Sequence, residues 1–327
     1  MPERDVIVVG GGPAGLAAAI ACQRRGLSCE VLEKGVLVNS IYRFPPHMVF
    51  FTTPELLEIG GMPLVSPFDK PTRIEALRYY RRVADALKLP VTLGETVERV
   101  EAGEGGLRTF STDAEGQPRV WRSRGAVLAI GYYDHPNRLG VPGEDLPHVS
   151  HYYSEAHPFY RKRVVVVGGA NSAAEAALDL YRSGASVTLV HRRAELSETI
   201  KYWVLPDIQN RIKEGAVAAR LGWQLTEITA GSVVVERDGS REELPADAVL
   251  LLTGYHPDRD FLARCGVGFE PETCLPMHDR DTYETNVPNV FLAGGVISDA
   301  RSHPIFIENG RHHGERAVEV IASRLRA

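Results

Sequence analysis

The feature that most constrains this chain is a pattern of residues that occurs twice. VIVVGGGPAGL stands at residues 6–16 and VVVVGGANSAA at residues 164–174. In each copy an apolar run of strand type meets glycine, and small residues then begin a helix. Strands that are apolar throughout are typical of parallel sheets covered on both faces. We therefore expect an α/β protein with two doubly wound, Rossmann-like units within its 327 residues.

The first copy carries the G-x-G-x-x-G pattern of a dinucleotide-binding loop at Gly10, Gly12 and Gly15. Gly10 makes the tight turn, Gly12 admits a pyrophosphate to the backbone, and Gly15 lets the helix pack on the strand. The pyrophosphate is expected at the helix N-terminus. Glu33 stands 23 positions after Gly10, at the end of the next predicted strand. A carboxylate there can accept a hydrogen bond from a ribose 2′-hydroxyl.

The second copy differs at the position that selects between dinucleotides. His191 stands 23 positions after Gly168, where Glu33 stands in the first copy. Arg192 and Arg193 follow it. A carboxylate repels a 2′-phosphate, whereas arginine binds phosphate with paired donors. The second loop is therefore predicted to bind NADPH, and the first a dinucleotide without the extra phosphate. The alternative interpretation of the His-Arg-Arg cluster is a solvated basic turn.

The order of the predicted elements indicates that the second unit is inserted into the first. Each unit continues through a short meander to one more apolar strand, which ends at Gly131 in the first and at Gly254 in the second. Tyrosine, histidine and proline follow both glycines, as expected where the chain crosses between domains. We expect a first domain over residues 1–133 and 257–327, and a second domain over residues 134–256.

The composition argues against several kinds of partner. The net charge is −5 and the arginines are spread along the chain, which does not favour nucleic acid. No apolar run approaches the roughly 20 residues of a membrane span, and the N-terminus does not resemble a signal peptide, so a cytoplasmic protein is expected. The four cysteines lack the spacing of a redox dithiol or zinc site. His312 and His313 are adjacent on a predicted helix and point about 100° apart, so we expect surface side chains and no metal.

Two dinucleotide sites in one chain indicate a flavoenzyme. The first site would hold FAD permanently, and the second would exchange NADPH. Transfer of a hydride between the two depends on the positioning of two planar rings and needs no nucleophilic side chain. For this reason the sequence assigns no catalytic residue.

The C-terminal run TNVPNVFLAG, residues 285–294, resembles the second FAD motif of the thioredoxin reductase-like flavoproteins. The resemblance covers essentially the whole chain and implies an FAD domain interrupted by an NADPH domain. Most members carry an aspartate after the last glycine of this motif, where this chain has Gly295. Thioredoxin reductases carry Cys-x-x-Cys before the NADPH loop, and the matching stretch HYYSEAH, residues 151–157, has no cysteine. Thioredoxin reductase activity is therefore not expected.

A narrower resemblance is to the YpdA family, which is described as bacillithiol disulfide reductases. It rests on the motifs NSIY (39–42), GYYDHPN (131–137), GVPGEDLP (140–147), TGYHPD (253–258) and IFIENGR (305–311). The resemblance implies an FAD enzyme that passes electrons from NADPH to a low-molecular-weight disulfide. Members of the family carry a cysteine in the first glycine loop, where this chain has Ala14. A thiol at a helix N-terminus would suit disulfide exchange, so its absence leaves the acceptor open.

The two sites are expected to draw on the following residues. The expected FAD contacts are Gly10, Gly12, Pro13, Ala14, Gly15, Glu33, Lys34, Asn39, Ser40, Val97, Gly131, Gly294, Gly295, Pro304 and Ile305. The expected NADPH contacts are Gly168, Gly169, Ala170, Asn171, Ser172, Ala173, His191, Arg192, Arg193, Lys201 and Gly254. Lys201 is interpreted as an added 2′-phosphate contact or as a solvated lysine.

Other functions stay open for such a chain. One is a ferredoxin– or flavodoxin–NADP reductase with a protein acceptor, since thioredoxin reductase-like enzymes of that kind also lack the dithiol. Another is a flavin-bearing redox sensor that turns over slowly. The resemblance also suggests a homodimer or a larger assembly.

Overall fold

The computed structural model describes residues 3–298 and 305–326 and divides the chain into two compact units. The first unit comprises Met1–Arg43, His47–His135 and Tyr255–Ala327, and the second comprises Phe44–Pro46 and Pro136–Gly254. The second unit is thus nested in the sequence of the first. Each unit has a sheet of its own with parallel strands at its centre.

The described part of the first unit forms a seven-stranded sheet. Its strands are β1 (Arg4–Val9), β2 (Cys29–Glu33), β3 (Val91–Leu93), β4 (Thr96–Gly103), β5 (Gly106–Thr112), β6 (Pro118–Leu128) and β15 (Val290–Leu292). The order is β3-β2-β1-β6-β5-β4, and β15 also pairs with β6. β1 is parallel to β2 and β6, whereas β4, β5 and β6 form an antiparallel meander.

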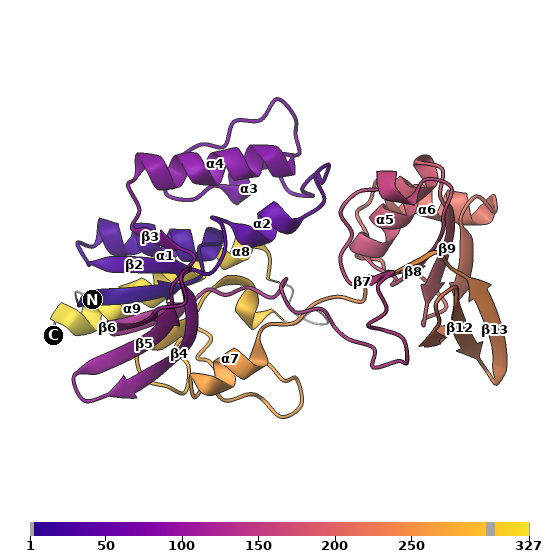
Figure 1. Cartoon of the computed structure of the whole chain (residues 1–327). Helices are drawn as coiled ribbons and strands as arrows, with labels where there is room; N and C mark the ends of the chain where they lie inside the picture. Colours follow the sequence, from indigo (N-terminus) through magenta and orange to yellow (C-terminus); the bar gives the residue numbers. More distant parts are fainter. Residues whose placement is uncertain (1–2, 299–304, 327) are drawn as a thin grey trace. The chain divides into compact units, whose positions relative to one another are not determined.

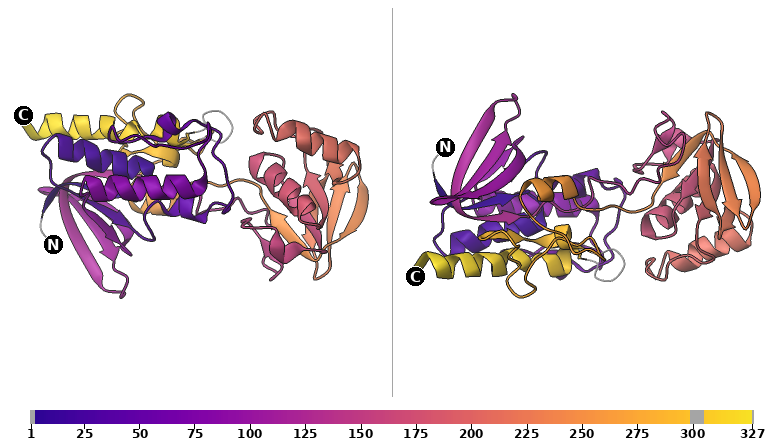
Figure 2. Two further views of the ribbon diagram at one scale, coloured as in Figure 1. Left: turned by 90° about the horizontal axis from the view of Figure 1, so that it is seen from above. Right: turned by 90° about the horizontal axis from the view of Figure 1, so that it is seen from below.

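Helices cover this sheet because its central strand is apolar on both faces. The helices of the unit are α1 (Pro13–Arg24), α2 (Asn39–Arg43), α3 (Pro54–Leu57), α4 (Arg73–Ala86), α7 (Arg259–Arg264), α8 (Ile307–Gly310), α9 (His313–Arg326) and the 3₁₀ turn η2 (Gly294–Ile297). α1 and α9 lie side by side, as Figures 1 and 2 show. Side chains alternate between the faces of a strand, so Ile7 and Val9 share one face of β1. They belong to a cluster that includes Phe261 and Leu262 of α7.

The second unit repeats the arrangement around its own central strand. Its parallel sheet has the order β10-β9-β8-β14-β7, with β7 (Val149–Ser150), β8 (Arg163–Val167), β9 (Ser186–His191), β10 (Ala218–Leu221) and β14 (Ala248–Leu251). β8 lies between β9 and β14 as β1 lies between β2 and β6. The prediction of two Rossmann-like units is therefore confirmed.

The two faces of this second sheet are covered by different elements (Figure 1). One core joins β8 and β9 to α5 (Asn171–Arg182) and α6 (Leu205–Lys213), next to the short turn η1 (His157–Phe159). The other core joins the sheet to an antiparallel sheet of β11 (Gln224–Ile228), β12 (Ser232–Arg237) and β13 (Ser240–Pro245). Among the helices described in residues 3–298 and 305–326, none is long and apolar enough to cross a membrane.

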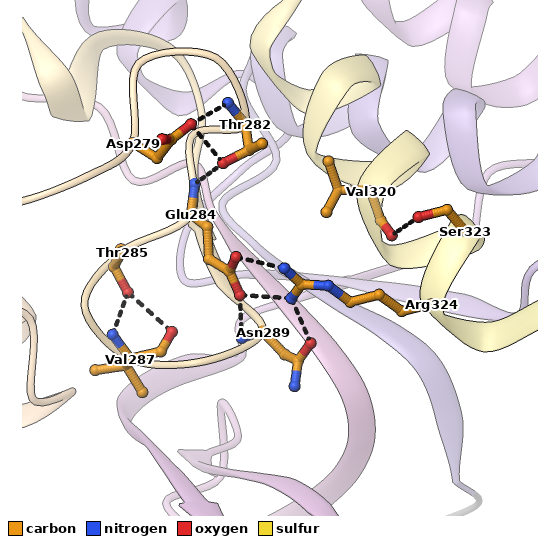
Figure 3. Close-up of polar contacts among 9 residues, drawn as sticks. All are labelled: Asp279, Thr282, Glu284, Thr285, Val287, Asn289, Val320, Ser323 and Arg324. Atoms are coloured by element: carbon orange, nitrogen blue, oxygen red, sulfur yellow. Dashed lines mark hydrogen bonds and ion pairs between the residues drawn. The ribbon is translucent and has the colours of Figure 1, made fainter. Parts of the chain in front are cut away.

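An ion pair fixes the segment that leads into β15 (Figure 3). Arg324 of α9 donates two hydrogen bonds of 2.6 Å to the two carboxylate oxygens of Glu284. The same guanidinium donates to Asn289 Oδ1 at 2.9 Å, and Glu284 Oε1 accepts the N–H of Asn289 at 2.8 Å. Such paired geometry orients both groups. The last helix thereby holds the turn that precedes β15, which leads to Gly294 and Gly295.

Candidate nucleotide-binding sites

The first glycine loop leaves its glycines no room for side chains on the protein side. A Cβ on Gly10 would lie 2.5 Å from the carbonyl oxygen of Ala129, and the φ of Gly10 is 108°. A Cβ on Gly15 would lie 1.9 Å from the carbonyl oxygen of Gly10. At Gly12, by contrast, an added Cβ would have no described neighbour within 4 Å. The loop is thus packed against its own sheet and open at Gly12.

The helix that follows this loop offers its N-terminus to an anion. Gly12 is the N-cap residue, Pro13 stands in the first turn, and no side chain of the described residues caps the helix. The first turn of α1 has no acidic residue. Backbone N–H groups and the helix dipole then favour negative charge at this end. Ala14 is half-buried there and lies against Gly294, where an added Cβ would be 2.7 Å from the Ala14 methyl.

Glu33 ties the first glycine loop to the end of β2. Its carboxylate is buried and accepts the N–H of Gly11 at 2.7 Å and the N–H of Gly35 at 2.8 Å. Burial raises the pKa of Glu33, and the two backbone hydrogen bonds oppose the rise. Val38 donates its N–H to the carbonyl of Gly11 at 3.0 Å with a φ of 50°. This conformation is strained for a β-branched residue, and such strain is common where a loop is held for binding.

The structure brings other expected FAD contacts to the same edge. Lys34 forms an ion pair of 2.7 Å with Asp134, which follows Gly131 in the chain by three positions. Gly131 has a φ of 66°, which favours glycine. The Asn39 side chain packs on Gly35, where an added Cβ would be 2.8 Å from Asn39 Oδ1. Lys34 and Asn39 therefore both lie beside the end of β2.

The remaining expected contacts of the first site are placed as follows. Ser40 lies in α2 and is half-buried. Val97 lies in β4 at an irregularity of its register and packs on the core that includes Ile7 and Val9. Ile305 donates its N–H to Ser298 Oγ at 3.0 Å. Pro304 lies outside the described residues.

The ring of Tyr132 lies against Gly295, at the position where the thioredoxin reductase-like motif usually has aspartate. A Cβ on Gly295 would lie 2.7 Å from Cδ1 and 2.8 Å from Cε1 of Tyr132. The Tyr132 ring fills the space into which an aspartate side chain would begin. Burial raises the pKa of the Tyr132 hydroxyl, so this group stays protonated near neutral pH. It can therefore donate a hydrogen bond where an aspartate could only accept.

His313 is not a surface residue, and that prediction was wrong. It is 6% exposed and stacks on Tyr283 with ring centroids 4.2 Å apart. Its Nδ1 accepts the N–H of Gly294 at 3.4 Å. Burial lowers the pKa of His313 to about 4, so the ring is neutral at neutral pH. The neighbouring Gly314 lets α9 approach α1, because an added Cβ would lie 2.7 Å from the Ala18 methyl.

The second glycine loop has the same geometry with a different partner. A Cβ on Gly168 would lie 2.5 Å from the carbonyl oxygen of Leu252, and its φ is 154°. A Cβ on Gly169 would lie 2.3 Å from the His191 ring. The corresponding Cβ on Gly11 would lie 3.1 Å from the Glu33 side chain. His191 thus takes the place of Glu33 in space as well as in sequence.

The N-terminus of α5 is open to an anion as well. Ala170 and Ser172 are exposed, Asn171 is half-buried, and Ala173 is buried under the helix. The first turn of α5 has no acidic residue, and no described side chain caps it. At Gly254, which is equivalent to Gly131, the φ is 91° and an added Cβ would lie 3.1 Å from Asn137 Nδ2.

The basic cluster beside this loop carries two exposed guanidinium groups. Arg192 and Arg193 are both exposed, and His191 is half-buried. Burial, followed by the charges of Arg193 and Arg192, lowers the pKa of His191. Both causes disfavour the charged form of the ring.

Lys201 is placed differently from these arginines. Its side chain is 7% exposed, and its ammonium lies 2.6 Å from Glu175 Oε1. The interpretation of Lys201 as a solvated lysine is therefore wrong. Sequence reasoning also missed Glu175 and Tyr132. Glu175 gives no local signal, whereas the exchange of the family aspartate for Gly295 could have pointed to a compensating neighbour.

The four cysteines are free thiols and lie outside both glycine loops. Cys22, Cys29 and Cys265 are buried, and Cys274 is exposed. Burial raises the pKa of Cys265 to about 11, so its thiolate is scarce at neutral pH. No two cysteines have the spacing of a dithiol. Ala14 leaves the first loop without a thiol.

Comparison with known proteins agrees with this geometry. The family model described as pyridine nucleotide-disulphide oxidoreductase matches residues 7–294. The bacilliredoxin reductase Bdr of Bacillus subtilis (strain 168) is 42% identical over 326 residues, which cover 99% of each chain. The chain belongs to the Bdr (YpdA) family. The family resemblance found in the sequence is thus confirmed, and the chain is a flavoprotein oxidoreductase that works with a pyridine nucleotide.

Solved structures of Bdr-family proteins have the same fold over their whole length. The bacillithiol disulfide reductase Bdr (YpdA) from Bacillus cereus is 41% identical, with a TM-score of 0.97 over 99% of this chain and 100% of that one. The Staphylococcus aureus protein of the same name is 36% identical, with a TM-score of 0.94 over 99% of each chain. T. acidophilum thioredoxin reductase, at 21% identity and a TM-score of 0.77, shares the fold. The predicted thioredoxin reductase-like fold is confirmed.

Proposed function

We propose that this Bdr-family chain passes two electrons from NADPH through FAD to a disulfide acceptor. The observation that carries the proposal is the exchange at equivalent positions of the two loops. Glu33 lies against Gly11 in the first unit, and His191 lies against Gly169 in the second. The exposed Arg192 and Arg193 follow His191 and match the charge of a 2′-phosphate. The first unit is therefore assigned to FAD and the second to NADPH.

The residues of the first unit fit FAD. The open face at Gly12 and the uncapped start of α1 suit a pyrophosphate. Each carboxylate oxygen of Glu33 accepts one backbone N–H and retains a further lone pair, so ribose hydroxyls can still donate to it. Asn39, Gly294 and the hydroxyl of Tyr132 would complete the site. When bound, FAD takes up a hydride from a nicotinamide and supplies two electrons to an acceptor.

In the second unit the chain supplies charge and backbone donors. Gly168, Gly169 and the start of α5 would hold the pyrophosphate of NADPH. The guanidinium groups of Arg192 and Arg193 would bind its 2′-phosphate, and His191 would become protonated beside that dianion. Hydride transfer from NADPH requires no side-chain base. The chain contributes mainly by positioning the nicotinamide.

The overall reaction converts NADPH, one proton and a disulfide into NADP⁺ and two thiols. The disulfide S–S bond breaks, the disulfide is reduced, and NADPH is oxidised. The names of the relatives support two acceptors, bacillithiol disulfide and bacilliredoxin. We place bacillithiol disulfide first, because the narrower family resemblance and two solved relatives carry that name. A protein acceptor is the second candidate, favoured by the name of the Bacillus subtilis relative.

The deciding experiment is anaerobic. The purified protein, which should be yellow and release FAD on denaturation, is mixed with one equivalent of NADPH until its flavin absorbance is bleached. Bacillithiol disulfide or oxidised bacilliredoxin is then added, and the return of the absorbance is followed by stopped flow. Prompt return with bacillithiol disulfide supports the first acceptor, and return with bacilliredoxin alone supports the second. If neither restores the absorbance, neither of these two disulfides is the acceptor, and ferredoxin or flavodoxin is tested next.

A further inference from the structure

A short segment of the second unit is tied to the second glycine loop. Residues 197–204, SETIKYWV, follow the basic cluster and lead into α6. We call this segment the strap. The N–H of Ser197 donates to the carbonyl oxygen of Gly169 at 2.8 Å. Ile200 is 3% exposed and belongs to the core that includes α5, so the middle of the strap is anchored.

Asn171 holds the strap with both ends of its side-chain amide. It is the first residue of α5 and belongs to the glycine loop. Its Nδ2 donates to the carbonyl oxygen of Thr199 at 2.9 Å. Its Oδ1 accepts the N–H of Lys201 at 2.9 Å. An amide that donates and accepts at once has its orientation set, so the start of α5 is fixed to the strap.

Lys201 and Glu175 make the next connection along the same helix face. Glu175 follows Asn171 by four positions in α5, which is one helical turn. The Lys201 ammonium lies 2.6 Å from Glu175 Oε1 and 5.9 Å from the centroid of the Trp203 ring. The lysine side chain is 7% exposed and the glutamate side chain 39% exposed. The ion pair is thus sheltered on the lysine side.

These contacts separate Lys201 from the two arginines. A residue that binds a 2′-phosphate has to be open to it, as Arg192 and Arg193 are. The Lys201 ammonium faces a carboxylate instead, which a phosphate would have to displace. The strap, however, contacts the loop through a carbonyl and a side chain, and it leaves Ala170 and Ser172 exposed at the start of α5.

We propose that Asn171, Glu175 and Lys201 are positioning residues that brace the second glycine loop in its nucleotide-binding shape. Lys201 then supports binding of the pyrophosphate and does not read the 2′-phosphate. The inference rests on the proposed use of NADPH at this loop. A loop that is already held in its binding shape loses less conformational entropy when the nucleotide binds. The resulting gain in affinity is the same for NADP⁺ and for NAD⁺.

The test is the affinity of the FAD-loaded, oxidised protein for NADP⁺ and for NAD⁺, measured by isothermal titration calorimetry without turnover. We expect Lys201→Met to weaken both by about tenfold, with the ratio of the two dissociation constants unchanged. Loss of NADP⁺ affinity alone would make Lys201 a direct 2′-phosphate ligand and overturn the proposal. Unchanged affinity for both nucleotides would overturn it as well.

Glu175→Ala gives a result of opposite sign under the two interpretations. If Lys201 braces the loop, loss of its partner lowers the affinity for both nucleotides. If Lys201 binds the 2′-phosphate, loss of Glu175 frees the ammonium and raises the affinity for NADP⁺ alone. The double variant should lose no more than either single variant, because both remove the same contact. Additive losses would show that Lys201 and Glu175 affect nucleotide affinity independently, and not through their ion pair.

Controls keep folding and function apart. Lys213→Met changes an exposed lysine of α6 in the same unit and should leave both affinities as in the wild type. Far-ultraviolet circular dichroism and FAD content report whether each variant is folded, and Lys201→Arg, which keeps the charge, should recover part of the lost affinity. A wild type that binds NAD⁺ as well as NADP⁺ would overturn the proposed cofactor preference, and the brace would still be judged by the losses of Lys201→Met. A wild type that binds neither nucleotide overturns both.

Discussion

The ring of Tyr132 occupies the space beside the backbone of Gly295. A Cβ at position 295 would lie 2.7 Å from Cδ1 of that ring, closer than carbon atoms approach without displacement. The two residues are far apart in the sequence. Tyr132 follows β6, and Gly295 lies in η2, which follows β15. The aspartate that related flavoproteins carry after this glycine could therefore not be accommodated here while Tyr132 keeps its place.

Gly295→Ala should destabilise the protein by about 1–3 kcal/mol, because the ring or the backbone must shift to admit the methyl group. Combining it with Tyr132→Ala should cost less than the sum of the two single changes, since the clash is gone. Urea unfolding of the FAD-loaded protein measures the effect. Gly103→Ala is the control, because an added Cβ there has no described neighbour within 4 Å. Strict additivity of the pair would contradict the packing described.

Replacing Arg192 and Arg193 by alanine should abolish the preference for NADP⁺. Two guanidinium contacts to a phosphate contribute together about 3 kcal/mol, so NADP⁺ affinity should fall by about a hundredfold while NAD⁺ affinity stays the same. Calorimetric titration of wild type and variant gives both values. Arg161→Ala, an exposed arginine of the same unit, serves as the control. An equal loss for NAD⁺ would mean that the arginines act on the loop and not on the phosphate.

His313 should make the stability of the protein depend on pH between about 6.5 and 4. Its pKa is lowered to about 4 in the folded state by burial, and then by the charges of His278 and His312. The unfolded chain, with a histidine pKa near 6.5, therefore takes up the proton first as the pH falls. Stability from this group is full above pH 6.5 and decreases by about 3 kcal/mol as the pH falls to 4.

The variant His313→Asn tests this sign. Asparagine can still accept the N–H of Gly294 but does not titrate, so the free energy of unfolding should change less steeply over the same range. The measurement is urea unfolding at several pH values for wild type and variant. The difference between the two slopes isolates His313 from the carboxylates that titrate in both proteins. Parallel slopes would mean that the pKa of His313 is the same in the folded and the unfolded chain, and would contradict the lowered value.

The thiols should react very unequally with an alkylating agent. Cys274 is exposed, whereas Cys22, Cys29 and Cys265 are buried. A hydrogen bond with Cys29, together with burial, raises the pKa of Cys22, and burial raises that of Cys265 to about 11. Iodoacetamide should therefore label one cysteine per native chain, and all four after unfolding, as counted by mass spectrometry.

The labelled protein should still oxidise NADPH at the rate of the untreated protein, because Cys274 belongs to neither glycine loop. The sample is protein that has been treated with iodoacetamide and then desalted. The control is protein taken through the same steps without iodoacetamide. Rapid labelling of a second cysteine, or a loss of NADPH oxidation in step with labelling, would show that a thiol takes part in the reaction.

The sequence by itself determined the two Rossmann-like units and the position of each loop. The reason is that a strand, a glycine turn and a helix start are set by short-range sterics, so Gly10 and Gly168 could be assigned from their neighbours alone. The exchange of Glu33 for His191 was readable for the same reason, because both stand at the same distance from their loops. The structure places both side chains against the loop glycines, as that spacing suggests.

Only the tertiary structure decided what happens between segments that are distant in the chain. His313 is buried because Gly314 lets α9 pack closely on α1, and Tyr132 fills the space beside Gly295. Lys201 finds Glu175 across 26 residues of chain. Periodicity and spacing describe which residues share a strand or a helix face, but they do not contain the packing of one element on another. These three contacts depend on that packing, and it exists only in the folded protein.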